Sequence, residues 1–181
     1  MKKRQVATLI YLICWSGSTF KTEAANSSLK PAAPYTYLLK NFTQNNVKVE
    51  IRAKIVTESE IFLSATFTPY PGYHLYSTRM PAKGIDGAGR PTKFDVSVEK
   101  PARLKMYGSV TDQPRPFNVI DKSLSRPLPI YPAGPVTLTR KGKYSPGASN
   151  VIVHLTYMSC RTDGGCTIPV ENKELRFTLK I

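Results

Sequence analysis

The sequence contains few of the residues that build most catalytic and metal-binding sites. Its 181 residues include three cysteines, two histidines and one tryptophan. A structural zinc site takes four Cys or His ligands, and a Ser-His-Asp triad needs a histidine beside its nucleophile. Nothing in the sequence sets His74 or His154 beside a serine and an aspartate in that way. We therefore expect no metal, no bound cofactor and no hydrolytic triad.

The positions of the two histidines support this expectation. His154 precedes Cys160 along a predicted strand, and that length of extended chain spans about 20 Å. His154 therefore cannot share a metal ion with Cys160. His74 lies among aromatic and aliphatic residues in the segment 72–76, where packing or hydrogen bonding accounts for it better than catalysis does.

Long apolar runs and helical periodicity are also missing. A transmembrane helix needs roughly 20 consecutive apolar residues, and no segment reaches that length, so we expect no membrane span. No stretch repeats apolar residues with the period of a helix. Internal repeats and low-complexity tracts are absent as well, so the chain after its N-terminal segment is expected to form one domain.

The N-terminus has the order of a secretory signal peptide. A basic start, Lys2-Lys3-Arg4, is followed by the short apolar run 6–15 and then by small and polar residues. Cleavage is expected after Ala24, with Ser18 as the alternative, so we predict that residues 1–24 are removed. Lipid attachment at Cys14 is disfavoured because Ile13 stands where a lipoprotein signal needs a small residue.

Acidic residues are scarce, at 12 against 26 lysines and arginines, and the formal net charge is +14. Nucleic acid is an obvious partner for such a charge, but export argues against it. The basic residues Lys48, Arg52 and Lys54 alternate along a predicted strand and do not form one dense run. We expect a solvated basic face, with weak attraction to anionic envelope surfaces as the alternative.

The rest of the chain shows the period of two that is typical of β-strands. Residues 25–46, rich in Asn, Ser, Pro and Ala, are predicted to form a flexible leader, and the domain is predicted to span 47–181. A proline-rich stretch, 108–134, excludes central strands. Many short strands with closely spaced turn signals predict an all-β, antiparallel immunoglobulin-like sandwich. Expected strands include 47–55, 61–67, 73–76, 94–98, 104–107, a strand starting at 136, 151–157 and 175–181.

Cys160 and Cys166 are the cysteines that remain after the predicted cleavage, and exported proteins fold where disulfides persist. The pair flanks Gly164-Gly165, which predicts a disulfide across the tip of a hairpin. Such a short loop contributes about 2 kcal/mol to stability, which favours exchange over a structural role. The residues alone leave two alternatives open, namely a redox-active pair and an inert clip in an exported binding or scaffold module.

Three segments resemble one known family. The segment 72–76 is similar to a Gly-aromatic-His-aliphatic-Tyr motif, 86–92 is similar to the loop that precedes the family's next strand, and 157–166 is similar to its aromatic strand ending in Cys-x5-Cys. The family is the N-terminal periplasmic domain of the thiol:disulfide interchange protein DsbD, including stand-alone versions. After Cys166 the chain keeps one proline, Pro169, where the family usually has two.

The resemblance implies a periplasmic protein with thiol:disulfide interchange activity and an immunoglobulin-like fold. It implies electron transfer from a membrane-linked thioredoxin-fold reductant to a disulfide isomerase or cytochrome-maturation reductase. Cys166 would form the mixed disulfide and Cys160 would resolve it. An aromatic residue on a loop caps the pair in the family. The best match here is Phe117 within 111–119, although packing of Phe117 under an irregular loop is the simpler alternative.

Overall fold

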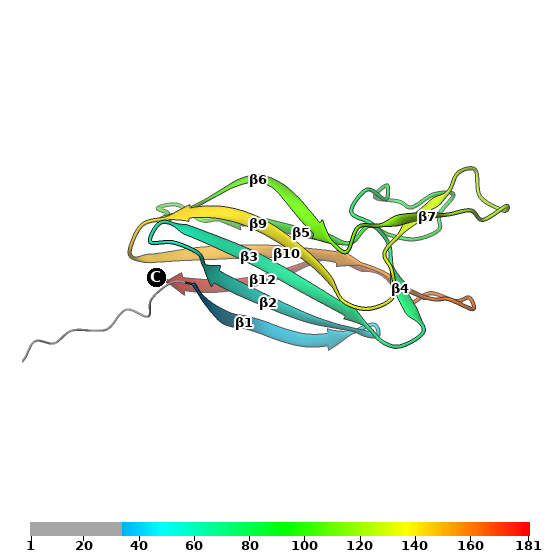
Figure 1. Ribbon diagram of the computed structural model, residues 1–181, viewed down its shortest axis with the longest axis horizontal. Coiled ribbons are helices and arrows are strands. Elements are labelled where there is room, and N and C mark those ends of the chain that lie inside the picture. Colours follow the sequence, from blue (N-terminus) through cyan, green and yellow to red (C-terminus); the bar gives the residue numbers. More distant parts are fainter. Residues whose placement is uncertain (1–33) are drawn as a thin grey trace, which may run out of the picture. The chain divides into compact units, whose positions relative to one another are not determined.

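The computed structural model describes residues 34–181, and over this range the chain forms strands and turns without a helix (Figure 1). No helix long and apolar enough to cross a membrane is found among these residues. The strands are β1 Tyr35–Gln44, β2 Val47–Ile55, β3 Glu60–Pro69, β4 Tyr73–Leu75, β5 Lys93–Val98, β6 Leu104–Gln113, β7 Phe117–Val119, β8 Leu128–Ile130, β9 Val136–Tyr144, β10 Ala148–Tyr157, β11 Ser159–Arg161 and β12 Val170–Lys180.

Most of these strands belong to two antiparallel sheets. The larger has the order β1-β2-β3-β9-β6 and the smaller the order β12-β10-β5. Buried residues of both sheets form a single hydrophobic core, which is the arrangement of a sandwich. The predicted fold class, an all-β immunoglobulin-like antiparallel sandwich, is confirmed.

The alternation in the sequence explains which faces are buried. Along β2 and β3, buried residues alternate with more exposed ones. The register pairs Val49 with Phe67 and Ile51 with Ala65 on the inner face, and all four side chains are inaccessible to solvent. Because successive residues of a strand point to opposite faces, one register places the alternating apolar residues of both strands in the core; Phe62 of β3 lies on the outer face instead.

The predicted leader is wrong for residues 35–44, because these residues form β1. This strand pairs along its length with β2, and the side chains of Leu39 and Phe42 pack against the core. Asn45 and Asn46 connect the two strands with φ values of 52° and 60°. Two positive φ values are the requirement of a tight type I′ hairpin turn, and asparagine tolerates them. The predicted signal peptide, 1–24, lies outside the described residues.

Two small sheets, β11 with β4 and β7 with β8, come from the segments that link the main strands. Figure 1 shows β4 and β7 at the end of the sandwich remote from the C-terminus. The proline-rich stretch contributes only the end of β6, an edge strand, and the three-residue strands β7 and β8. This agrees with the expectation that proline keeps the stretch out of central positions.

Candidate functional site

A disulfide joins Cys160 and Cys166, with an S–S distance of 2.03 Å. Cys160 is on β11, and the chain then turns back so that the two cysteines face each other in an antiparallel bridge. Gly164 and Gly165 make this turn with φ values of 106° and 83°, a region that glycine enters without steric cost. Two backbone hydrogen bonds close it, from Arg161 N–H to the Gly165 carbonyl at 2.9 Å and from Gly164 N–H to the Arg161 carbonyl at 3.3 Å. The predicted hairpin-tip disulfide is therefore present.

The two sulfurs have different access to solvent. Cys160 is only 3% exposed and belongs to a small hydrophobic cluster with Tyr76, Met80 and Ile85. Cys166 lies in the turn and is exposed. Thiol–disulfide exchange requires direct attack of a thiolate on one sulfur, so access decides which sulfur is attacked. Cys166 is therefore the accessible sulfur of the pair.

Tyr76 provides a hydrogen-bond donor to the buried sulfur. Its hydroxyl donates to Cys160 Sγ at 3.2 Å. Burial raises the pKa of Tyr76, so this hydroxyl keeps its proton at neutral pH. If the disulfide opens, the same hydroxyl faces the Cys160 thiolate, and a hydrogen bond to a charged group is stronger than one to a neutral group.

The loop after β4 holds the Tyr76 ring in place. Thr92 donates to the Tyr76 carbonyl from its backbone N–H at 3.2 Å and from its hydroxyl at 2.7 Å. Gly89 packs directly against the ring: a Cβ at this position would lie 2.8 Å from Tyr76 Cε1 and 2.7 Å from Met80 Cε. The glycine-rich loop 83–89 thus has a packing role beside the cysteines.

His74 lies opposite Cys160 in the pairing of β4 with β11. Its ring makes an edge contact with the Tyr76 ring, with 5.5 Å between centroids. Burial lowers the pKa of His74, so the imidazole is neutral at pH 7. The residue therefore brings a neutral, half-buried ring to the wall of the site and no positive charge.

A cavity of about 550 Å³ lies over the disulfide and is lined by both cysteines, Phe117 and Tyr131, among others. Phe117, at the start of β7, is 49% exposed. Tyr131 is fully buried, and its hydroxyl donates to Asp112 Oδ2 at 2.7 Å. Burial, followed by this hydrogen bond, raises the pKa of Tyr131 to about 12. The predicted cap residue and the cysteine pair thus share one cavity.

Arg161 does not direct its charge at the cysteines. Its guanidinium donates to Asp163 Oδ1 at 2.7 Å, and both side chains are exposed. The hydrogen bond with Asp163 raises the pKa of Arg161, and the same bond lowers the pKa of Asp163. The charges of Arg161 and Asp163 therefore offset each other within the turn.

His154 lies on β10 and contacts Glu174 Oε2 of β12 at 3.3 Å, on the exposed side of the smaller sheet. Within residues 34–181, no group of three or more His, Cys, Asp or Glu side chains is placed to hold a metal ion.

The sequence did not identify Tyr76 and Tyr131 as site residues. Tyr76 is separated from Cys160 by 84 positions, and Tyr131 contacts Asp112 of the edge strand β6. The available signal for Tyr76 was the similarity of the segment 72–76 to a family motif that ends in this tyrosine.

No protein-family model and no curated protein matches the sequence. Several solved structures are similar to the chain. The reduced N-terminal domain of DsbD from Neisseria meningitidis is 17% identical, with a TM-score of 0.43, over 75% of this chain and 85% of that one. The N-terminal periplasmic domain of ScsB from Proteus mirabilis is 13% identical, with a TM-score of 0.45, over 82% and 52%. The GAE domain of GGA2p from Saccharomyces cerevisiae is 14% identical, with a TM-score of 0.39, over 82% and 97%.

Proposed function

We propose that this protein is a thiol–disulfide exchange module that passes electrons between thioredoxin-fold proteins through Cys160 and Cys166. The observation that carries the proposal is the asymmetry of the disulfide. Cys166 is exposed, whereas Cys160 is buried and receives a hydrogen bond from Tyr76. An inert clip needs no such difference, but an exchanging pair needs one accessible sulfur and one sulfur that leaves easily.

The first step is attack by a partner thiolate on Cys166 Sγ. A bond forms between the partner sulfur and Cys166, the Cys160–Cys166 bond breaks, and Cys160 leaves as a thiolate. The Tyr76 hydroxyl, 3.2 Å from that sulfur, stabilises the charge as it develops. A better-stabilised leaving thiolate departs faster.

A second thiolate of the same partner then attacks the partner sulfur of the mixed disulfide. Cys166 leaves as a thiolate, so the partner is oxidised by two electrons and this pair is reduced. The reverse sequence returns the electrons to an oxidised acceptor, and Cys160 acts there as the resolving thiol. No cofactor takes part. A membrane-linked thioredoxin-fold reductant is the donor, and a disulfide isomerase or a cytochrome-maturation reductase is the acceptor.

Phe117 acts in this proposal as a cap over the pair. It lines the same cavity as both cysteines, and the short β7–β8 hairpin that carries it belongs to neither main sheet. Replacement Phe117→Ala should speed reduction by a small thiol a few-fold and leave thermal unfolding unchanged. Ile120→Ala, at an 80% exposed position in the connection between β7 and β8, is the control. Equal reduction rates for the two variants would contradict the role of Phe117 as a cap.

The proposed location is the bacterial periplasm. The N-terminal sequence has the order of a signal peptide, with cleavage expected near Ala24, and the proposed chemistry needs a compartment where disulfides persist.

Trapping of mixed disulfides tests the assignment of the two sulfurs. The Cys160→Ser variant retains exposed Cys166 and should form a stable mixed disulfide with a thioredoxin-fold protein or with an aromatic disulfide reagent. The Cys166→Ser variant retains only buried Cys160 and should react far more slowly. The rates are measured by release of the reagent's chromophore. Equal reactivity of the two variants, or wild-type exchange by Cys166→Ser, would contradict the assignment and favour the binding module with an inert clip.

A further inference from the structure

A second cavity lies along one open flank of the sandwich, between β5 and β6. These strands are edge strands of the smaller and the larger sheet, respectively. The groove between them has a volume of about 1040 Å³, at the upper end of the range of small-molecule sites. None of its lining residues lines the cavity over the disulfide. The groove is therefore a separate feature from the exchange site.

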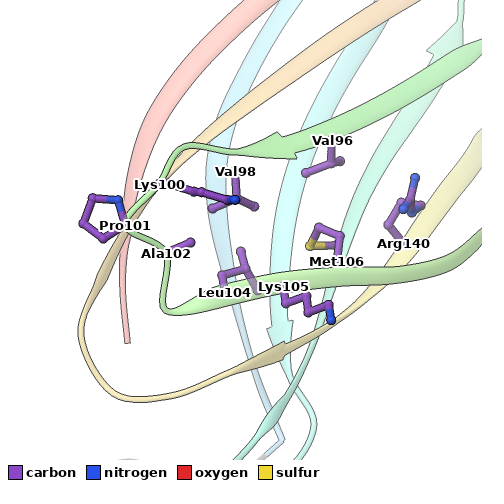
Figure 2. Close-up of a pocket in the computed structure, with 9 residues that line it drawn as sticks. All are labelled: Val96, Val98, Lys100, Pro101, Ala102, Leu104, Lys105, Met106 and Arg140. Atoms are coloured by element: carbon purple, nitrogen blue, oxygen red, sulfur yellow. The ribbon is translucent and has the colours of Figure 1, made fainter.

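The groove has an apolar interior. Val96 and Val98 of β5 face Leu104 and Met106 of β6 across it (Figure 2). These side chains are the continuation of the core between the two sheets, and three of them are only partly covered. The loop that joins the two strands closes one end of the groove in this view. A groove lined mainly by apolar side chains fits a hydrocarbon chain.

Arg140 occupies an inward-facing position of β9. In the register with β3 it lies opposite Leu63, on the same face as the next pair, Leu138 with Ala65. Leu63, Leu138 and Ala65 are fully buried core residues, so Arg140 is a cation in an apolar row. Its Nε is inaccessible to solvent and has no hydrogen-bond partner. A buried donor without a partner is costly to the fold, so this position is an unusual place for a cation.

The charges around the groove have one sign. Lys100 and Lys105 are exposed and line it together with Arg140, and none of its nine lining residues is acidic. A second copy of this chain would bring further positive charge to the same place, since the formal net charge is +14, and like charges in contact disfavour association. The complementary occupant is an anion with an apolar tail.

We propose that this groove binds a long-chain carboxylate, with the alkyl chain between β5 and β6 and the carboxylate on Arg140. The carboxylate pairs with the part of the Arg140 guanidinium that lines the groove, where arginine and carboxylate form charge-assisted hydrogen bonds. The apolar side chains of both strands cover the alkyl chain and make it the main source of binding free energy. Lys100 and Lys105 attract the anion without fixing its position.

Isothermal titration calorimetry with sodium dodecanoate, below its critical micelle concentration, tests this proposal on the purified protein. We expect saturable binding of one dodecanoate per chain. Dodecyl maltoside and dodecyltrimethylammonium, which carry the same chain with a neutral or cationic head, should bind at least about tenfold more weakly. Absence of saturable binding, or equal affinity for the three head groups, would overturn the proposal.

Variants locate the site. Arg140→Gln should weaken dodecanoate binding at least about tenfold, and Arg140→Lys should recover part of the loss because it retains the charge. Lys141→Gln is the matched control, since Lys141 is exposed and faces the opposite side of the same strand, and it should change the affinity less than twofold. Circular dichroism confirms that each variant is folded. Equal effects of Arg140→Gln and Lys141→Gln would indicate general charge attraction and contradict a site at Arg140.

Discussion

At the scale of single residues, the proposed chemistry depends on the surroundings of Cys160. Its sulfur is buried among apolar side chains, an environment that raises the free energy of a thiolate. The Tyr76 hydroxyl is the group that opposes this effect, at 3.2 Å from the sulfur. In the proposed mechanism Tyr76 therefore acts on the leaving group through this hydrogen bond.

Replacement of Tyr76 by Phe tests this role. A hydrogen bond to a charged group contributes about 1.5 kcal/mol or more, so its loss should slow reduction by dithiothreitol about tenfold. Stopped-flow measurement of the reduction rate at pH 7 provides the test. Tyr107→Phe on the edge strand β6 is the control, because it removes a hydroxyl that donates to Glu60 of β3. This variant should retain the wild-type rate. If Tyr76→Phe also retains it, the hydroxyl does not assist the leaving thiolate.

His74 gives the stability of the domain a pH dependence. Burial lowers its pKa from the ordinary value of 6.5, so the unfolded state binds the proton more readily than the folded state. The contribution of this neutral ring to stability is complete above pH 6.5. It is lost as the pH falls from about 6.5 through the lowered pKa.

We therefore expect urea denaturation between pH 7 and pH 5 to show a falling free energy of unfolding in the wild type and a flatter profile in His74→Gln. This window lies above the range in which carboxylates with lowered pKa values, such as Asp86 and Asp121, take up protons. Parallel pH profiles for the two proteins would show that His74 is not the group responsible.

At the scale of elements, the loop between β4 and β5 places the Tyr76 ring. Gly89 has a φ of 76° and leaves no room for a Cβ beside that ring, whereas Gly87 has a φ of 86° and nothing within 4 Å of its would-be Cβ. Both glycines therefore have a positive φ, but only a Cβ at Gly89 would contact Tyr76. Comparing alanine variants at the two positions separates the strain of a positive φ from the displacement of the Tyr76 ring.

Gly87→Ala should lower the free energy of unfolding by about 1 kcal/mol, because alanine is strained at positive φ, and Gly89→Ala should lower it further because its Cβ also clashes with Tyr76 and Met80. Only Gly89→Ala should in addition slow disulfide exchange, since it displaces Tyr76 from Cys160. Urea denaturation and the dithiothreitol reduction rate measure the two effects. A wild-type exchange rate for Gly89→Ala would show that the position of the ring does not matter.

The elements also show how far a sequence predicts this structure. The alternation of buried and more exposed residues was sufficient to predict β2 and β3, because each strand has one face in the core and one face toward solvent. β1 was not recognised because it is an edge strand with mostly exposed residues and no clear period of two. The turn at Asn45-Asn46 was the available signal for a hairpin.

The candidate site was predictable only in part. The cysteine pairing is local in sequence, with a separation of six residues, so the turn residues between them indicated it. The contact of Tyr76 with Cys160 spans 84 positions and depends on the pairing of β4 with β11, which no local pattern contains. Arg140 was not predicted either, because the sequence did not indicate which residues after Leu138 face the core.

At the scale of the whole molecule, the core between the two main sheets contains neither cysteine, since Cys160 belongs to the separate small cluster. Opening the disulfide therefore leaves the core intact. The short loop implies a loss of about 2 kcal/mol on reduction, less than the stability of an ordinary domain. Reduced protein should show the same far-ultraviolet circular dichroism and a single cooperative urea transition at somewhat lower concentration. Unfolding on reduction would show that the bond is structural.

The central claim, that the pair exchanges electrons, is tested most directly by the reduction potential of the Cys160–Cys166 disulfide. The protein is equilibrated with glutathione or dithiothreitol buffers, and its free thiols are alkylated and counted by mass spectrometry. The proposed function predicts a potential between roughly −180 and −270 mV, the range of known exchange proteins, with equilibrium reached quickly. A potential below about −300 mV with slow reduction is typical of structural disulfides and would contradict it.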